Sequence, residues 1–93
     1  MIQSFADAET EKLFQGIISR RLPQNLHKVM HRKLVMLNAV ANLADLRVPP
    51  NNRLEALKGD RKGQHSIRVN QQWRVCFRWT DSGPADVEIV DYH

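Results

Sequence analysis

The sequence is poor in cysteine and in long hydrophobic runs, and both shortages exclude classes of protein. Cys76 is the single cysteine among 93 residues, so no internal disulfide can form. Small secreted domains usually depend on disulfides, which makes the reducing cytoplasm the expected location. No apolar run approaches the roughly 20 residues of a membrane-spanning helix, and the apolar stretch at residues 1–5 is too short for a signal sequence. We therefore expect no membrane insertion.

The length and composition predict one globular domain over residues 1–93. The chain is shorter than the roughly 100 to 200 residues of a typical domain, which leaves no room for a second one. Apolar residues make up 42% of the chain and charged residues 26%, and a disordered chain would carry fewer large aliphatic side chains. A core of this size is marginal, so a complex with a partner would stabilise it.

The positive charge is concentrated in one part of the chain. The formal net charge is +4, whereas residues 53–78 alone hold seven Lys or Arg against two Asp or Glu, which gives +5. A compact basic surface favours a polyanionic partner, because neutralising phosphates releases condensed counterions. The basic residues of this window are Arg53, Lys58, Arg61, Lys62, Arg68, Arg74 and Arg78.

The first half of the chain has the spacing of helices. Asp7 or Thr10 is a suitable cap for a short helix that runs to about Gln15, and Gly16 is a suitable stop. After Pro23, apolar residues recur in steps of three and four, which predicts a long helix over residues 24–46. The two prolines at positions 49 and 50 then favour a loop.

After this loop the apolar period changes from 3.6 to 2, which predicts strands. Residues 66–69 and 72–79 alternate on either side of a short turn at Asn70-Gln71, and a third strand follows a turn at residues 81–84. Within the middle strand one face is apolar, and the other carries Arg74, Cys76 and Arg78. The predicted fold is therefore α+β, with N-terminal helices packed on a small antiparallel β-sheet and with Trp73, Phe77, Leu34 and Leu37 in the core.

Several short motifs have an ordinary structural interpretation. The basic turn at residues 58–63 lacks the G-K-[ST] of a phosphate-binding loop, and Gly59 or Gly63 is expected at positive φ. His27 and His31 are four residues apart but have no third ligand in register, so we predict no metal site and no cofactor. Cys76 has no CxxC partner, which is typical of a half-buried inert thiol.

Four segments together carry a family resemblance that covers nearly the whole chain. They are the run L-E-A-L-K-G-D-R at residues 54–61, S-I-R-V at 66–69, Q-W-R-V at 72–75 and the terminal D-Y-H, after an N-terminal M-I-Q-S-F. In this order they resemble the HigB/GraT-type toxins of the RelE superfamily, which belong to type II toxin–antitoxin systems. The resemblance implies a RelE-like microbial RNase fold. It also implies an enzyme that cuts messenger RNA in the ribosomal A site and is held inactive by a HigA- or GraA-like helix-turn-helix antitoxin, through which alone operator DNA is bound.

The resemblance also assigns candidate site residues. The implied catalytic positions are Lys58, Arg74, Asp91, Tyr92 and His93, and the implied RNA-binding positions are Lys58, Arg61, Lys62, Arg68, Arg74 and Arg78. Some relatives have a histidine where this chain has Glu55, which is here either a weak base or an exposed carboxylate that lowers the activity.

Elementary chemistry agrees with these assignments. Cleavage without a metal proceeds by attack of the substrate's 2′-OH on the adjacent phosphorus, which requires a base, cations and an acid. Arg74 and Lys58 are suitable cations, while Asp91, Tyr92 and His93 can transfer or orient protons; the sequence does not decide which is the acid and which the base.

The competing interpretation is a protein without chemistry. It would be a basic RNA-binding module, or a weakened toxin that acts only through its antitoxin complex. Binders of single strands place several aromatic side chains on the binding face for base stacking. Here the aromatic stripe of the middle strand is expected in the core, which leaves mainly Tyr92 for that purpose and favours the enzyme.

Overall fold

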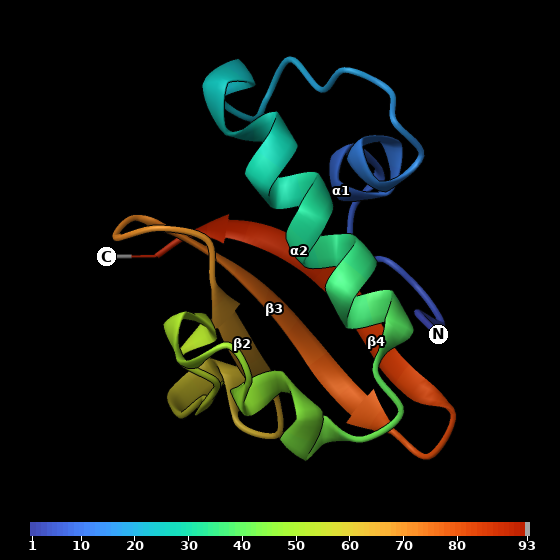
Figure 1. Cartoon of the computed structure of the whole chain (residues 1–93), viewed down its shortest axis with the longest axis vertical. Helices are drawn as coiled ribbons and strands as arrows, with labels where there is room; N and C mark the ends of the chain where they lie inside the picture. Colours follow the sequence, from blue (N-terminus) through green and yellow to red (C-terminus); the bar gives the residue numbers. More distant parts are fainter. Residues whose placement is uncertain (93) are drawn as a thin grey trace.

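The computed structural model describes residues 1–92 as two helices packed on one face of a four-stranded antiparallel sheet (Figure 1). This arrangement confirms the predicted α+β class. The helices are α1 (Ala8–Phe14) and α2 (His27–Ala39), and the strands are β1 (Glu55–Ala56), β2 (His65–Arg68), β3 (Trp73–Thr80) and β4 (Gly83–Asp91). Short 3-10 turns are η1 (Gln24–Leu26), η2 (Leu43–Arg47), η3 (Pro50–Asn52) and η4 (Gly59–Arg61).

The sheet is a meander in which the strands follow one another in the order β1-β2-β3-β4. Asn70 makes the turn between β2 and β3, because its side-chain oxygen accepts hydrogen bonds from the backbone N–H groups of Gln72 and Trp73, each at 2.8 Å. The N-terminal segment runs parallel to β4 and exchanges backbone hydrogen bonds with it, which partly covers that edge of the sheet. None of the helices in residues 1–92 combines the length and hydrophobicity that crossing a bilayer requires.

Helix α1 has the ends that its sequence predicts. The Asp7 carboxylate accepts a hydrogen bond of 2.7 Å from the backbone N–H of Thr10, which satisfies one of the free donors of the first turn. Gly16 follows the helix with φ at 84°, a conformation that a side chain would strain. The chain then turns away and returns as α2.

Helix α2 is shorter than the predicted helix over residues 24–46. It begins at His27, after η1, and ends at Ala39, where Val40 becomes extended. The physical reason is Asn42, which caps the separate turn η2: its side chain and that of Asp45 form a reciprocal capping box. Leu43 and Leu46 keep the apolar spacing but contact the core from η2.

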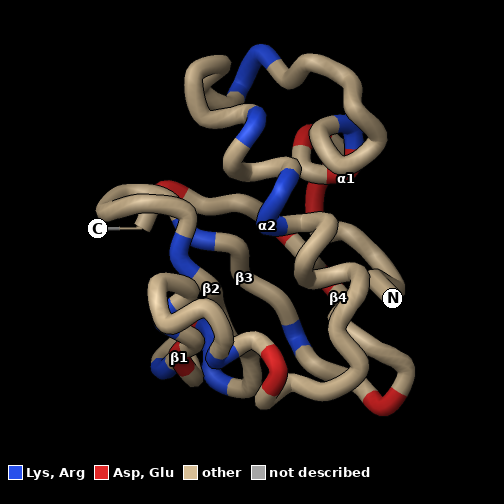
Figure 2. The backbone as a smooth tube through the Cα atoms, viewed as in Figure 1, with Lys and Arg blue, Asp and Glu red and all other residues tan. Residues whose placement is uncertain are grey.

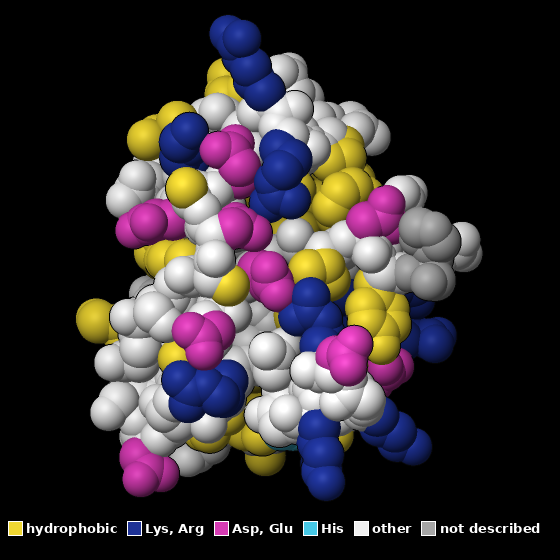
Figure 3. Space-filling model, turned by 180° about the vertical axis from the view of Figure 1, so that it is seen from behind, with side chains coloured by type: hydrophobic (Ala, Val, Ile, Leu, Met, Phe, Trp, Pro, Cys, Tyr) yellow, Lys and Arg dark blue, Asp and Glu magenta, His cyan; other side chains and the backbone are white. Residues whose placement is uncertain are grey.

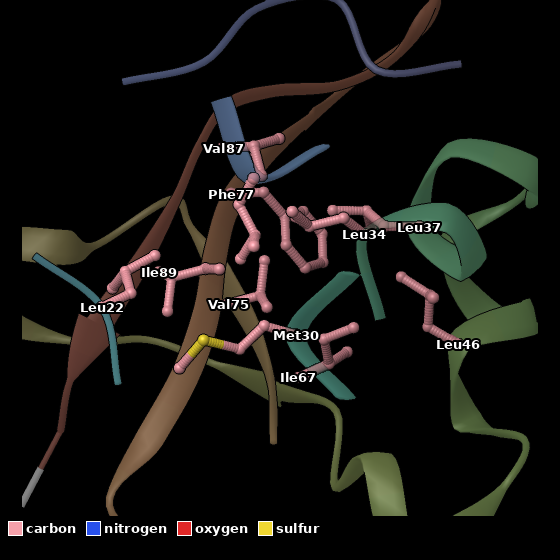
Figure 4. Packing of buried hydrophobic residues seen from close by; sticks show 11 residues of the cluster. Leu22, Met30, Leu34, Leu37, Leu46, Ile67, Val75, Phe77, Val87 and Ile89 are labelled. Carbon is pink, nitrogen blue, oxygen red and sulfur yellow. The ribbon is translucent and has the colours of Figure 1, made fainter. Parts of the chain in front are cut away.

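The hydrophobic core lies between α2 and the sheet (Figure 4). Phe77, Leu34 and Leu37 are completely buried, as predicted, and Figure 4 shows the Phe77 ring of β3 facing the two leucines. Trp73 is only half-buried and packs against the margin of this cluster. The cluster fixes α2 on one face of the sheet. We call the opposite face, towards which Arg74, Cys76 and Arg78 point, the outer face.

The outer face of β3 is covered over part of its length, and the prediction of a half-buried Cys76 is wrong. Arg74 and Cys76 both point away from the core in the β3 alternation, yet Arg74 is 8% exposed and Cys76 is completely buried. The reason is the segment after η3, which runs beside β2 and brings the Arg53 carbonyl and the Arg61 side chain over this face. Arg78, further along β3, is exposed as expected.

Candidate active site

An open pocket of about 400 Å³ lies on the outer face, beside the β2–β3 turn and the end of β4. It has basic and polar walls, and we call it the Arg74 pocket. Its lining residues are Arg53, Glu55, Arg68, Asn70, Gln71, Arg74 and Tyr92. Strand pairing explains why they meet: Arg68 of β2 is directly opposite Arg74 of β3, and the end of β4 pairs with the start of β3.

The guanidinium of Arg74 is held by its neighbours. Its Nε donates to the Ser66 hydroxyl at 2.7 Å, and its Nη2 donates to the Arg53 carbonyl at 2.6 Å. Its Nη1 lies 3.9 Å from the Glu55 carboxylate, whose side chain is 52% exposed. Because its hydrogen bonds orient a cation that is nearly removed from water, Arg74 is prepared to bind an anion without rearranging.

A buried chain of contacts positions the Arg53 carbonyl. Arg53 adopts a left-handed conformation with φ at 45° directly after the turn η3. The preceding residue, Asn52, is completely buried; it accepts a 2.6 Å hydrogen bond from the Lys33 ammonium of α2 and donates to the Leu46 carbonyl. Burial lowers the pKa of Lys33, and the neighbouring Arg32 adds to this effect. Through Asn52 and the Arg53 carbonyl, Lys33 thus connects helix α2 to the Arg74 guanidinium.

The pocket combines positive charge with a phenol. Among the lining residues within 1–92, Arg53, Arg68 and Arg74 contribute three cations, and Glu55 contributes one carboxylate. The Arg74 guanidinium lies over the Tyr92 ring, 5.9 Å from its centroid, within the range of a cation–π contact. Figure 2 shows the Lys and Arg positions of this region in blue along β1, β2 and β3. This arrangement suits a phosphodiester, whose charge the arginines neutralise.

The remaining predicted cations lie outside this pocket. Lys58 and Lys62 are exposed at the two ends of η4. Arg61 donates to Glu88 of β4 at 2.7 Å, and this hydrogen bond raises the pKa of the guanidinium. Arg78 donates to Asp86 at 3.1 Å. Seen from behind the view of Figure 1, the molecule accordingly has acidic side chains intermixed with basic ones (Figure 3).

The end of β4 is held in place up to Tyr92. The Tyr92 backbone N–H donates to the Gln72 carbonyl at 2.6 Å, and the Asp91 carboxylate accepts from the Gln72 side chain at 3.0 Å. Asp91 is opposite Trp73 in the register and alternates with Tyr92, which puts the two side chains on different faces of the strand. His93, the fifth predicted catalytic residue, lies outside the described residues.

Four contributors to the pocket were not singled out from the sequence. Arg53 had been counted only as part of the basic window, and Asn70 and Gln71 only as a turn. Ser66 orients Arg74 from the neighbouring strand. The position of Ser66 two residues before Arg68, on the same strand face, was the one signal that could have identified it.

Two other side chains that the sequence drew attention to, Cys76 and His27, lie outside the lining of the Arg74 pocket. Burial raises the pKa of the Cys76 thiol, so its thiolate is disfavoured. The His27 Nε2 atom lies 3.1 Å from the Leu22 carbonyl. Within residues 1–92, no group of three or more His, Cys, Asp or Glu side chains is arranged to hold a metal ion.

Comparison with known proteins relates the whole chain to one family. Residues 3–93 match the family model described as the RelE-like toxin of the type II toxin–antitoxin system HigB. Toxin HigB-1 of Vibrio cholerae is 42% identical over 94 residues, which covers 100% of this chain and 98% of that protein. Endoribonuclease HigB of Proteus vulgaris is 27% identical over 93 residues and is covered completely, as is this chain.

Solved structures support the same fold. YafQ of E. coli superimposes with a TM-score of 0.60 at 18% identity, covering 98% of this chain and 91% of that one. A YoeB/ParE toxin of Agrobacterium tumefaciens gives a TM-score of 0.51 at 18% identity, covering 99% and 96%. These similarities show that the helices and the sheet have the RelE-like arrangement.

Proposed function

Since this chain belongs to the HigB family of RelE-like toxins, we propose that it cleaves messenger RNA in the ribosomal A site by attack of the RNA's own 2′-OH. Membership makes it the toxin of a type II toxin–antitoxin system and a homologue of the HigB endoribonuclease. The observation that carries the proposal is Arg74, a nearly buried guanidinium fixed by Ser66 and by the Arg53 carbonyl at the base of an open cationic pocket.

The pocket supplies the charge stabilisation that this reaction needs. Attack of the 2′-OH on phosphorus builds negative charge on the phosphorane oxygens and leaves a 2′,3′-cyclic phosphate and a 5′-OH. Arg74 donates hydrogen bonds to these oxygens, with Arg68 opposite it as the second cation. Lys58 is exposed at the start of η4, outside the pocket, and we propose that it contacts a neighbouring phosphate of the same RNA strand. Because these side chains supply the cations, we propose that the reaction needs no metal ion.

We assign the proton transfers to the end of the chain. Tyr92 lines the pocket beside Arg74 and is within reach of a bound phosphate, and His93 is the next residue. These two side chains remove the 2′-OH proton and protonate the 5′-oxygen. Asp91 acts as a positioning residue, since its contact with Gln72 holds the strand end that carries Tyr92.

The shape of the pocket explains the proposed dependence on the ribosome. Its cations can neutralise a phosphate, but the pocket is open, and within residues 1–92 Tyr92 is the one aromatic residue in its lining. In-line attack requires the 2′-oxygen, the phosphorus and the leaving oxygen to be aligned. The reaction rate rises by orders of magnitude when the substrate is held rigidly in that alignment. The ribosomal A site supplies that constraint. We propose that Arg61, Lys62 and Arg78 contact RNA phosphates outside the pocket, for which Arg61 and Arg78 must first leave Glu88 and Asp86.

The proposed biological setting follows from the family. An antitoxin is the partner that a type II system implies. We propose that it is a HigA-like helix-turn-helix protein, that operator DNA is bound only through it, and that the released toxin acts in the cytoplasm on the 30S A site.

End mapping tests this function. The purified chain is added to messenger RNA that is either naked or held on programmed ribosomes, and new 5′-ends are located by primer extension and analysed for their chemical groups. We expect discrete 5′-OH ends with matching 2′,3′-cyclic phosphates on ribosomes only. Equal cleavage of naked RNA would contradict ribosome dependence, 5′-phosphate ends would contradict 2′-OH attack, and ribosome binding without new ends would favour the binding module.

A further inference from the structure

A second hollow surface is lined by residues of α2 and of the end of α1. These helices cover the face of the sheet opposite the outer face, which carries the Arg74 pocket (Figure 1). One hollow, of about 300 Å³, lies between the end of α1 and the start of α2, and a second, of about 680 Å³, follows along α2. Both are lined by Lys28 and His31, so the two hollows adjoin along α2, and together we call them the α1–α2 groove.

The groove exposes several large apolar side chains. Ile17 is 50% exposed, Ile18 is 66% exposed and Val35 is 46% exposed. They make up half of the six large hydrophobic residues that are exposed in residues 1–92. A single exposed aliphatic residue is ordinary, but several around one depression are typical of a surface that another protein covers.

The charged residues that line the groove, Lys28 and Arg32, are both basic. Residues 12–44 contain six Lys or Arg and no Asp or Glu, and this stretch includes the whole of α2. Figure 2 shows the blue positions on α2 and on the chain before it. Lys28 and Arg32 line the groove and are exposed, and neither forms an ion pair within the described chain. A partner that covers the groove must therefore bring acidic groups next to apolar ones.

We propose that the α1–α2 groove is the docking site for an acidic segment of the antitoxin that presents an apolar face. The proposal rests on the chain's proposed function as a toxin held inactive by such a partner. The apolar face contacts Ile17, Ile18 and Val35, and flanking carboxylates pair with Lys28 and Arg32. If the segment is helical, residues spaced i, i+3 and i+4 provide this pattern.

Other occupants fit the surface less well. A second copy of this chain would bring a net charge of +4 to an already basic groove, which opposes association. RNA would meet isoleucine and valine where base stacking needs aromatic rings. An interfacial membrane helix usually carries large aromatic or leucine side chains towards the lipid, whereas the groove exposes two isoleucines and a valine divided between a loop and a helix.

Affinity measurements with the purified cognate antitoxin test the proposal. The groove variants are Ile18→Asp and the double variant Lys28→Glu/Arg32→Glu. The matched controls are Val48→Asp and Arg47→Glu, which make the same kinds of change at exposed positions outside the groove. Both groove variants should bind the antitoxin about 10-fold more weakly or worse, and the controls should bind as the wild type does. The double variant changes only exposed side chains, so it keeps the test valid if Ile18→Asp lowers stability.

Cleavage on programmed ribosomes by the free variants separates this proposal from the proposed function. We expect the groove variants to cleave at the wild-type rate while escaping the antitoxin. Unchanged antitoxin affinity in the folded double variant would overturn the docking site, whether or not the wild type cleaves RNA. Loss of binding to anionic phosphatidylserine vesicles or to ribosomes, with antitoxin affinity unchanged, would overturn it in favour of a membrane or RNA surface. Absence of cleavage by the wild type would instead contradict the proposed function and leave the affinity comparison intact.

Discussion

Glu55 is the residue that opposes the positive charge of the Arg74 pocket. Its carboxylate lies 3.9 Å from the Arg74 guanidinium, and the side chain is about half exposed. The phosphate of a bound RNA would enter the same space and would meet the carboxylate as a like charge. Solvent weakens this repulsion, so Glu55 should reduce substrate affinity without abolishing it.

The substitution Glu55→Gln should therefore increase activity. It keeps the shape of the side chain and removes the charge, and we expect kcat/KM for ribosome-bound messenger to rise by roughly 2- to 10-fold, mainly through KM. The enhancement should diminish at high salt, because exposed charges are screened. A tenfold or greater fall in kcat with KM unchanged would instead identify Glu55 as a base in the reaction.

Tyr92 and His93 should be needed for chemistry rather than for folding. Tyr92→Phe keeps the ring beside Arg74 and removes only the hydroxyl, and His93→Gln removes the titratable ring. We expect each substitution, or deletion of both residues, to lower the cleavage rate by about 10² to 10⁴. Circular dichroism and antitoxin binding should remain those of the wild type. A deletion variant that cleaves like its parent would show that the terminal residues are not catalytic.

The proximity of Arg68 and Arg74 could be predicted from the sequence, because the two residues flank a short turn between paired strands. Tyr92 was assigned through the family resemblance, and it lies near Arg74 because it directly follows β4, which pairs with β3. Arg53 was beyond such reasoning, because its place in the pocket depends on its left-handed backbone and on the buried Asn52. The pairing of Arg61 with Glu88, 27 residues away, likewise depends on tertiary contacts.

At the scale of elements, α2 both covers the core and supports the pocket. The helix buries Leu34 and Leu37 against the sheet and holds Asn52 through Lys33. The predicted helix extended to residue 46, whereas α2 ends at Ala39. The apolar spacing continues through Leu43 and Leu46, and periodicity does not distinguish one helix from a helix followed by a capped turn. The strands were predicted more closely, since a two-residue period together with turn residues determines their pairing.

Leu37→Ala should test the packing of α2 on the sheet. The leucine is completely buried beside Phe77, so its truncation should reduce the free energy of unfolding by about 2–5 kcal/mol. Val35→Ala is the matched control on the same helix, because Val35 is exposed, and it should change stability by no more than about 0.5 kcal/mol. Urea unfolding followed by circular dichroism measures both values. Equal stability of the two variants would show that α2 does not pack as described.

Lys33 should make stability depend on pH. Burial lowers its pKa in the folded protein below the ordinary value of about 10.4, so the unfolded chain binds this proton more tightly. The free energy of unfolding should therefore contain a component that rises with pH between the lowered pKa and about 10.4. Lys33→Met lacks that component, so the stability of the wild type relative to the variant should increase across this range. Urea unfolding at several alkaline pH values measures the free energy of unfolding of both proteins. A difference between them that does not change with pH would contradict the lowered pKa of Lys33.

At the scale of the whole molecule, the two proposed interactions use opposite sides of one small sheet. The outer face carries the Arg74 pocket, and the helices on the other face carry the α1–α2 groove. The basic character of residues 53–78 was readable from the sequence, but its division into a pocket and paired surface arginines was not. Arg61 and Arg78 contribute to the net charge while their own partners neutralise them locally.

The central claim is that RNA cleavage takes place in the Arg74 pocket rather than over a diffuse basic surface. The most direct test is the cleavage rate on programmed ribosomes for Arg68→Ala compared with Arg47→Ala. Both variants lose one arginine, but Arg68 lines the pocket and Arg47 is exposed at the end of η2, outside it. We predict that Arg68→Ala lowers the rate by roughly 10² to 10³, as expected for a lost transition-state donor, and that Arg47→Ala stays within about threefold of the wild type. Similar small losses for both variants would contradict the claim, because a diffuse surface responds to charge and not to position.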